Sequence, residues 1–286
     1  MKAAFAAGAA YELAEGLGIK KFDIIMSMSS SGPTLTYFTS EQFSTIKDVW
    51  ENELGRLEFV KKMNIFTGKP IFNLDYLIGD IFGRKYPLDI TKFKETPTRL
   101  FIPVYNYLTE KVEYFSNKQS EVDLDVCHAL RATMAIHPEQ IVQKENLGPF
   151  IDPALVSPLV YERAITEGAT HFLVVSNHQG LEWTIKKMLG FQLFKLFQSR
   201  NFPKNVKRKL KEYPKSIKHE IEHFKEFCQN YNVLFIQPPI ASKVRTVMVT
   251  NKQVKGAVEY GREIMQKAKD NQLIEVFRQR SKELCQ

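Results

Sequence analysis

The sequence predicts a single α/β domain, residues 1–286, in which a mainly parallel sheet is covered by helices. Three observations favour this fold class. Short, strongly apolar segments alternate with longer segments of helical periodicity along nearly the whole chain. Hydrophobic residues make up 44% and charged residues 25% of the sequence, which is the balance of a packed globular protein. The sequence contains no internal repeat, low-complexity tract or interdomain linker.

The first elements form one unit of an α/β fold. Residues 2–15 are a predicted helix because apolar residues recur four apart on one side, and a Gly-Leu-Gly step ends it. Residues 22–28 form an apolar segment that no turn former breaks, which predicts a buried strand. Four small residues follow, and Pro33 suits the first turn of the next helix.

The rest of the chain continues the alternation of strands and helices. Residues 42–98 predict a helix-rich insertion with glycine and proline turns. The remaining predicted elements are strands at 98–106 and 111–115 joined by a turn, a helix at 122–135, an extended segment at 150–152, a helix at 157–167, a strand at 170–176, helices within 181–229, a strand at 233–237 and a closing helix at 253–284.

Composition excludes several classes of protein. No stretch approaches the ~18–20 apolar residues of a membrane-spanning helix. Three widely spaced cysteines provide no disulfide framework and no paired zinc ligands, which favours a cytoplasmic setting. The first ten residues are too weakly apolar for a signal peptide. The net charge of +8 suits nucleic acid, an anionic membrane or an acidic substrate, and charge alone does not distinguish them.

The strand, turn and helix at 22–40 lie where an α/β hydrolase places its nucleophile motif, Gly-x-Ser-x-Gly. That motif holds the serine on a strained turn, keeps its neighbours small, and aims the next N–H at the substrate oxyanion. Here the segment reads Ser27-Met28-Ser29-Ser30-Ser31, with serines at both glycine positions. Serines at a helix start also act as N-caps, which is the structural alternative here.

Further segments match a family pattern in the right order. They are Lys2 with the helix motif at 7–13, the strand at 22–26, the segment 68–77, Leu-Arg-Ala-Thr-Met-Ala-Ile at 130–136, Ile-Asp-Pro-Ala at 151–154, and the turn and strand at 167–175. Over most of its length the chain resembles the patatin-like phospholipase family, in its bacterial single-domain branch.

The resemblance implies a three-layer α/β/α fold and a Ser–Asp dyad that hydrolyses acyl esters of phospholipids or related lipids. Ser29 would attack the ester carbonyl, and Asp152 would accept the serine proton and later activate water. The Ser30 N–H would donate to the oxyanion. No metal ion or organic cofactor is implied. An alternative alignment makes Ser30 the nucleophile and places Gly32 at the second glycine of Gly-x-Ser-x-Gly. This alignment breaks the spacing between motifs that is typical of the family. Asp152 alone also suits a carboxylate that caps a helix.

The chain departs from the family's pattern in three places. It begins after the position of the glycine-rich loop, so we expect the first strand and the oxyanion loop to be missing. Ser27 and Ser31 replace the elbow glycines, and Pro153 replaces the glycine after the aspartate, which fixes φ and removes an N–H. A truncated gene model or a degenerate relative would explain the first departure, and the two substitutions favour degeneration. The departures imply impaired activity and support a second hypothesis, a lipid- or protein-binding relative without catalysis.

Residues 219–223 carry a competing signal. His219, Glu220 and His223 match the H-E-x-x-H pattern of helical zinc proteases, with the glutamate as general base. No histidine follows to complete a set of three histidine ligands, although a glutamate could serve. A surface helix is the structural alternative, and a zinc protease is the remote functional one.

A strongly basic stretch covers residues 200–218. The structural interpretation is a solvated helix with an apolar side on the core. The functional one is peripheral docking on an anionic membrane, where each basic side chain contributes ~1 kcal/mol. No nucleic acid is expected, because no reading motif accompanies the charge. The basic residues are Arg200, Lys204, Lys207, Arg208, Lys209, Lys211, Lys215 and Lys218.

Overall fold

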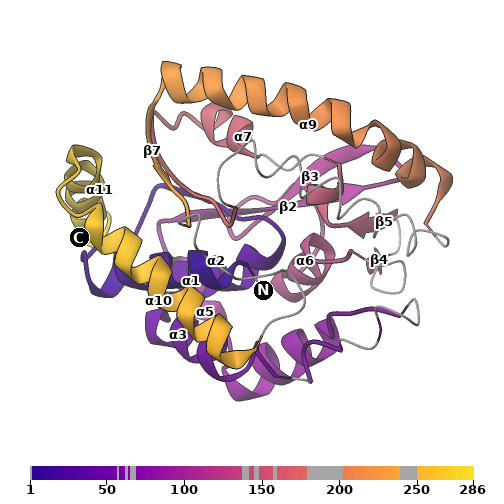
Figure 1. Cartoon of the computed structure of the whole chain (residues 1–286), viewed down its shortest axis with the longest axis horizontal. Coiled ribbons are helices and arrows are strands. Elements are labelled where there is room, and N and C mark those ends of the chain that lie inside the picture. The colour runs from indigo at the N-terminus through magenta and orange to yellow at the C-terminus, as the bar shows by residue number, and fades with distance from the viewer. Residues whose placement is uncertain are drawn as a thin grey trace.

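The computed structural model of the chain is a mixed α/β structure (Figure 1). It describes residues 2–56, 58–61, 64, 69–136, 142–144, 148–156, 160–178, 202–238 and 250–286. The strands in these ranges form one sheet of five strands and another of two. Within the same ranges, none of the helices combines the length with the apolar character that crossing a bilayer requires.

The five-stranded sheet is mixed, so the prediction of a mainly parallel sheet is wrong for it. The first strand pairs with the central strand in parallel, and the other pairings are antiparallel. The strand order is β1-β2-β5-β4, with β3 on the other edge of β2. These strands are β1 (Ile24–Met26), β2 (Arg99–Asn106), β3 (Lys111–Ser116), β4 (Val142–Lys144) and β5 (Gly148–Ile151).

A tight turn explains the first antiparallel pairing. The Asn106 side chain accepts hydrogen bonds from the N–H groups of Leu108 and Thr109 at 3.0 and 3.3 Å. Asparagine favours turns because its short side chain bonds to nearby backbone in this way. The chain therefore reverses between β2 and β3, and two strands joined by so short a turn are antiparallel. The predicted strand–turn–strand unit is confirmed here.

The registers bring the ends of β1 and β5 together along one edge of β2. β1 runs parallel to β2 and ends with Met26 opposite Phe101. β5 runs the other way and ends with Ile151 opposite Tyr105. β3 occupies the opposite edge of β2 over residues 101–106, so β1 and β5 share the remaining edge. The carboxyl ends of β1 and β5 therefore point toward each other along β2, separated by the positions between Phe101 and Tyr105.

The smaller sheet pairs β6 (His171–Val175) in parallel with β7 (Asn232–Ile236), and both predicted strands are confirmed. The long helix α9 (Lys204–Asn230) leads into β7 and lies along one outer side of the molecule (Figure 1). Among the described strands none precedes β1, and β1 pairs with β2 alone.

Helix α1 (Ala4–Glu15) crosses α10 (Asn251–Lys267) at very short distance. A Cβ atom added at Gly8 would lie 1.8 Å from the Val258 carbonyl oxygen, and one at Gly261 would lie 2.0 Å from that of Phe5. Both contacts are with backbone atoms, which cannot move aside as the end of a flexible side chain can. Positions 8 and 261 therefore require glycine. The alanines and the glycine of α1 therefore allow the two helices to approach this closely.

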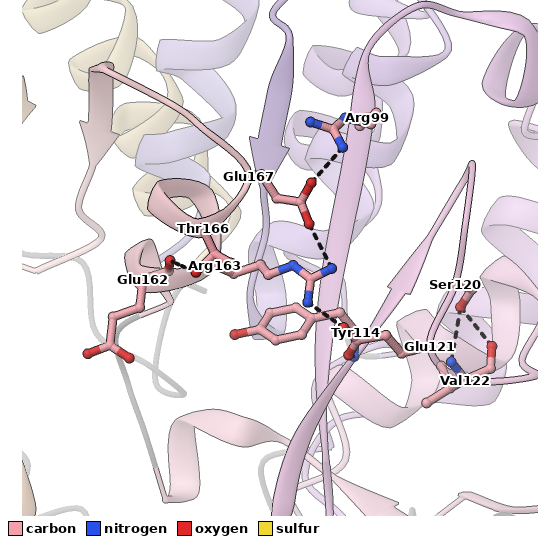
Figure 2. A network of polar contacts seen from close by, with 9 residues as sticks. All are labelled: Arg99, Tyr114, Ser120, Glu121, Val122, Glu162, Arg163, Thr166 and Glu167. Atoms are coloured by element: carbon pink, nitrogen blue, oxygen red, sulfur yellow. Dashed lines mark hydrogen bonds and ion pairs between the residues drawn. The ribbon is translucent and has the colours of Figure 1, made fainter.

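A polar network ties α7 (Tyr161–Thr166) to the central sheet (Figure 2). Arg163 bonds to Glu121 and, at 2.7 Å, to Glu167, and Arg99 binds the other oxygen of Glu167 at 2.6 Å. The Arg163 guanidinium also lies 5.2 Å from the ring centre of Tyr114 on β3. A carboxylate shared by two arginines holds α7 against β2.

The other helices match the prediction in part. The predicted helix 122–135 is shorter in the structure, and the closing helix 253–284 is two helices, because Asn271 caps a second start with a hydrogen bond from the Leu273 N–H. Residues 157–159 and 181–201 of the predicted helices lie outside the described residues. The remaining helices are α2 (Gly32–Thr39), α3 (Phe43–Asn52), the π-helical η2 (Tyr76–Lys85), α5 (Ile90–Glu95), α6 (Val126–Thr133) and α11 (Gln272–Glu283).

Candidate active site

Ser29 lies on a strained turn that follows β1, separated from the strand by Ser27 and Met28. Its φ of 53° is in the left-handed region, which costs a side-chain-bearing residue about 1–2 kcal/mol. Ser29 is the first residue of a single 3-10 turn, η1 (Ser29–Ser31), which continues directly into α2. Pro33 lies in the first turn of that helix. The Ser29 N–H donates a 3.0 Å hydrogen bond to Thr133 Oγ1 at the end of α6. Strain held in place by a tertiary contact is typical of a functional residue.

Asp152 lies directly after β5 and is only 2% exposed. Its N–H donates to the Ala135 carbonyl at 3.0 Å, and its Oδ1 accepts the Ala154 N–H at 2.8 Å. The carboxylate therefore does cap the short turn η4 (Pro153–Leu155), as the structural alternative expected. This cap uses one carboxylate oxygen and leaves the other to face the end of β1.

The second carboxylate oxygen binds the serine. Ser29 Oγ donates to Asp152 Oδ2 at 2.5 Å, a short distance that is typical of a hydroxyl bound to an ionised carboxylate. The two residues are 123 positions apart in the sequence, and the convergence of β1 and β5 along β2 brings them together. Ser29 makes the contact with Asp152. The resemblance described above also favoured Ser29 over Ser30 as the nucleophile.

The serines at the two glycine positions are accommodated without displacing the turn. Ser27 is buried, and its N–H donates to the Phe101 carbonyl at 3.0 Å as a continuation of β1. The Ser31 hydroxyl donates to the Met28 carbonyl at 2.6 Å and accepts the Met28 N–H at 3.0 Å. Ser31 thus closes the turn around Ser29 with its own side chain.

Gly32, which follows the elbow, is closely packed against α6. A Cβ atom there would lie 2.9 Å from Leu130 Cδ2 and 3.3 Å from Thr133 Cγ2. Sequence reasoning missed Thr133 as the acceptor for the Ser29 N–H. The only available signal was its place in the Leu-Arg-Ala-Thr match at 130–133.

Pro153 causes no conflict after the aspartate. It occupies the first position of η4, where a helical turn has no acceptor for an N–H. The N–H that the Asp152 carboxylate needs comes from Ala154, one residue later. Ser30 lies in the first turn after the elbow, where backbone N–H groups also lack an acceptor within the turn.

Lys2 and the two histidines of the zinc-protease pattern lie far from Ser29 and Asp152 in the sequence or form other contacts. Lys2 Nζ and His178 Nδ1 are 3.1 Å apart and join the start of α1 to the end of β6. His219 and His223 are exposed on α9, with ring centres 3.9 Å apart. Across the described part of the chain, no group of three or more His, Cys, Asp or Glu side chains is placed to hold a metal ion. The zinc-protease pattern therefore has no third ligand among the described residues.

Comparison with known proteins adds no assignment: no family model and no curated protein matches the chain.

Proposed function

We propose that the chain is a serine hydrolase of acyl esters in phospholipids or related lipids, with Ser29 as nucleophile and Asp152 as base. The observation that carries the proposal is the 2.5 Å hydrogen bond from Ser29 Oγ to Asp152 Oδ2. The left-handed backbone at Ser29 supports it, because a nucleophile elbow requires that conformation.

The first half-reaction forms an acyl-enzyme. Ser29 Oγ attacks the ester carbonyl carbon while its proton passes to Asp152 Oδ2. Negative charge develops on the carbonyl oxygen, and the Ser30 N–H and the start of α2 stabilise it. The tetrahedral intermediate collapses, the bond to the alcohol oxygen breaks, and Asp152 returns its proton to the leaving alcohol.

The second half-reaction releases the acid. Asp152 accepts a proton from a water molecule, which attacks the acyl carbon on Ser29. Collapse of this intermediate breaks the bond to Ser29 Oγ, which regains a proton from Asp152. The Ala154 N–H at Oδ1 keeps the carboxylate oriented through both steps. No metal or organic cofactor takes part in this sequence.

The three-layer patatin-like fold is part of the same proposal. It is supported by Figure 1, in which α9 lies on one side of the strands and α1, α2 and α3 lie on the other. The parallel pairing of β1 with β2 and the strand–turn–helix unit at Ser29 also suit it.

The test is labelling by a fluorophosphonate probe, which reacts with activated serine hydroxyls. We expect the chain to be labelled, Ser29→Ala to abolish labelling, and Asp152→Asn to reduce it strongly, because asparagine does not accept the proton. Ser30→Ala is the matched control and should remain labelled, since only its N–H is used. If the folded chain is not labelled, or if Ser30→Ala rather than Ser29→Ala removes the label, the proposed mechanism is wrong. A folded chain that binds lipid without labelling would support the non-catalytic alternative.

A further inference from the structure

Helix α9 carries a straight row of exposed basic side chains. Its members recur at intervals of four, three, four and three residues, which places them on one face of a helix. The opposite face is apolar and buried, with Val206, Leu210, Ile217, Ile221 and Phe224. We call the exposed row the α9 basic stripe; it consists of Lys204, Arg208, Lys211, Lys215 and Lys218.

Most of this charge has no ion-pair partner among the residues that the structure describes. Arg208 binds both carboxylate oxygens of Glu110 at 2.6 and 2.7 Å, so it helps to attach α9 to the hairpin. Lys204, Lys211, Lys215 and Lys218 form no ion pair with any residue that the structure describes. Glu212 is the single acidic residue between positions 204 and 218. The stripe therefore presents several uncompensated positive charges to its surroundings.

Helix α9 packs beside the candidate active site through the face opposite the stripe. Val206 and Leu210, from the buried face of α9, belong to one apolar cluster with Ile151 and Leu155. Those two residues lie on either side of Asp152 in the chain. The Asn205 side chain also donates to the Tyr107 carbonyl at the end of β2. The helix that carries the stripe is thus attached to the segment around Asp152 and to the residue that follows β2.

We propose that the α9 basic stripe docks the chain on an anionic phospholipid surface and so holds it at a membrane that contains its lipid substrate; this inference rests on the proposed function and deepens it. The five residues span about 21 Å of helix at 1.5 Å per residue, which gives a linear contact with several headgroups. Four of the five are lysines, which act as point charges. The sequence around the stripe contains no motif that reads nucleic acid, which favours the lipid surface.

The test is sedimentation with vesicles of neutral phosphatidylcholine, with or without anionic phosphatidylglycerol. All chains carry Ser29→Ala, so that hydrolysis does not alter the vesicles. We expect binding only to the anionic vesicles. The stripe variant, Lys211→Gln with Lys215→Gln and Lys218→Gln, should bind about 100-fold more weakly, since each charge contributes roughly fivefold. Binding should also fall when salt shortens the Debye length from ~10 to ~3 Å.

A second triple variant removes the same charge elsewhere. Lys252→Gln, Lys255→Gln and Lys267→Gln change exposed lysines of α10, and their binding should equal that of the Ser29→Ala parent. Equal losses in both variants would show that net charge alone attracts the chain and would overturn the proposal. Binding to neutral vesicles as tightly as to anionic ones, or tighter binding to single-stranded DNA than to vesicles, would overturn it as well.

The two proposals fail in different ways. The stripe variant with Ser29 restored should still hydrolyse a short, soluble ester at the parent rate, because the stripe does not contact the dyad. A chain that binds anionic vesicles but does not react with the fluorophosphonate probe would contradict the proposed function alone. A chain that reacts with the probe but binds no vesicles would contradict the docking surface alone. Circular dichroism of each variant confirms that it is folded.

Discussion

Replacing Thr133 by valine tests whether the strained elbow depends on one tertiary hydrogen bond. Valine has nearly the shape of threonine, so the buried packing around position 133, which is 0% exposed, is kept. The change removes Oγ1, the atom that accepts the Ser29 N–H at 3.0 Å. Thr133 is then a positioning residue, because it acts on substrate only through Ser29.

The expected magnitude follows from two costs. The Ser29 N–H would lose its acceptor, and a buried N–H without an acceptor costs about 1–3 kcal/mol. The left-handed conformation of Ser29 itself costs ~1–2 kcal/mol, which the hydrogen bond to Thr133 now offsets. If the turn keeps its conformation, the free energy of unfolding falls by about 1–3 kcal/mol, or about 2–4 °C in melting temperature for each kcal/mol. If Ser29 relaxes instead, the active arrangement becomes rarer and fluorophosphonate labelling slows by about 10- to 100-fold.

The assay measures the labelling rate and the melting temperature together. Thr133→Ser is the control, because it restores the hydroxyl and loses only a methyl group, at a cost of about 1 kcal/mol. It should label at close to the rate of the unmodified chain. If Thr133→Val is as stable and labels as fast as the unmodified chain, the hydrogen bond does not hold the elbow and the reasoning fails.

Two other predictions concern stability. Gly261→Ala should lower the free energy of unfolding by more than about 3 kcal/mol, because its Cβ would meet the Phe5 carbonyl oxygen at 2.0 Å. Gly256→Ala on the same helix meets nothing within 4 Å and should be neutral or stabilising by up to about 1 kcal/mol in a thermal melt; equal losses in both would contradict the close helix crossing. The hydrogen bond from Arg280 lowers the pKa of Asp23, so the pair stabilises the folded state above the ordinary aspartate pKa of 3.8, and this stability is lost as the pH falls through the lowered value. Arg280→Gln should therefore reduce stability at neutral pH and make no difference in strong acid, which urea unfolding at several pH values would reveal; a constant difference at all pH values would rule out the linkage.

Local pattern was enough to predict much of the fold. The apolar segments at 170–176 and 233–237 are strands in the structure, and the hairpin at 98–115 forms where a turn was expected. These elements succeed because strand alternation and turn chemistry act between neighbours in the chain. The break between α10 and α11 was missed, because the prediction gave one closing helix, although Asn271 is a favourable N-cap residue just before Gln272.

Packing between distant segments decided what the pattern did not. The insertion at 42–98 contains η2, whose wider helical winding has no distinct sequence signature at this position. The α1–α10 crossing requires glycine at positions 8 and 261, and the sequence shows only that small residues are frequent there. A contact between segments about 250 positions apart is invisible to any local rule.

The candidate site shows the same division. The sequence by itself determined the strand–turn–helix unit that carries Ser29, and the resemblance to a family pattern selected Asp152 as its partner. Only the tertiary structure decided that β5 runs against β2 on the edge that β1 also uses, and this places Asp152 Oδ2 2.5 Å from Ser29 Oγ. It also assigned the supporting contacts to Thr133 and Ala154. The reason is physical: strand direction and neighbour choice depend on which faces can be buried together, and that is a property of the whole chain.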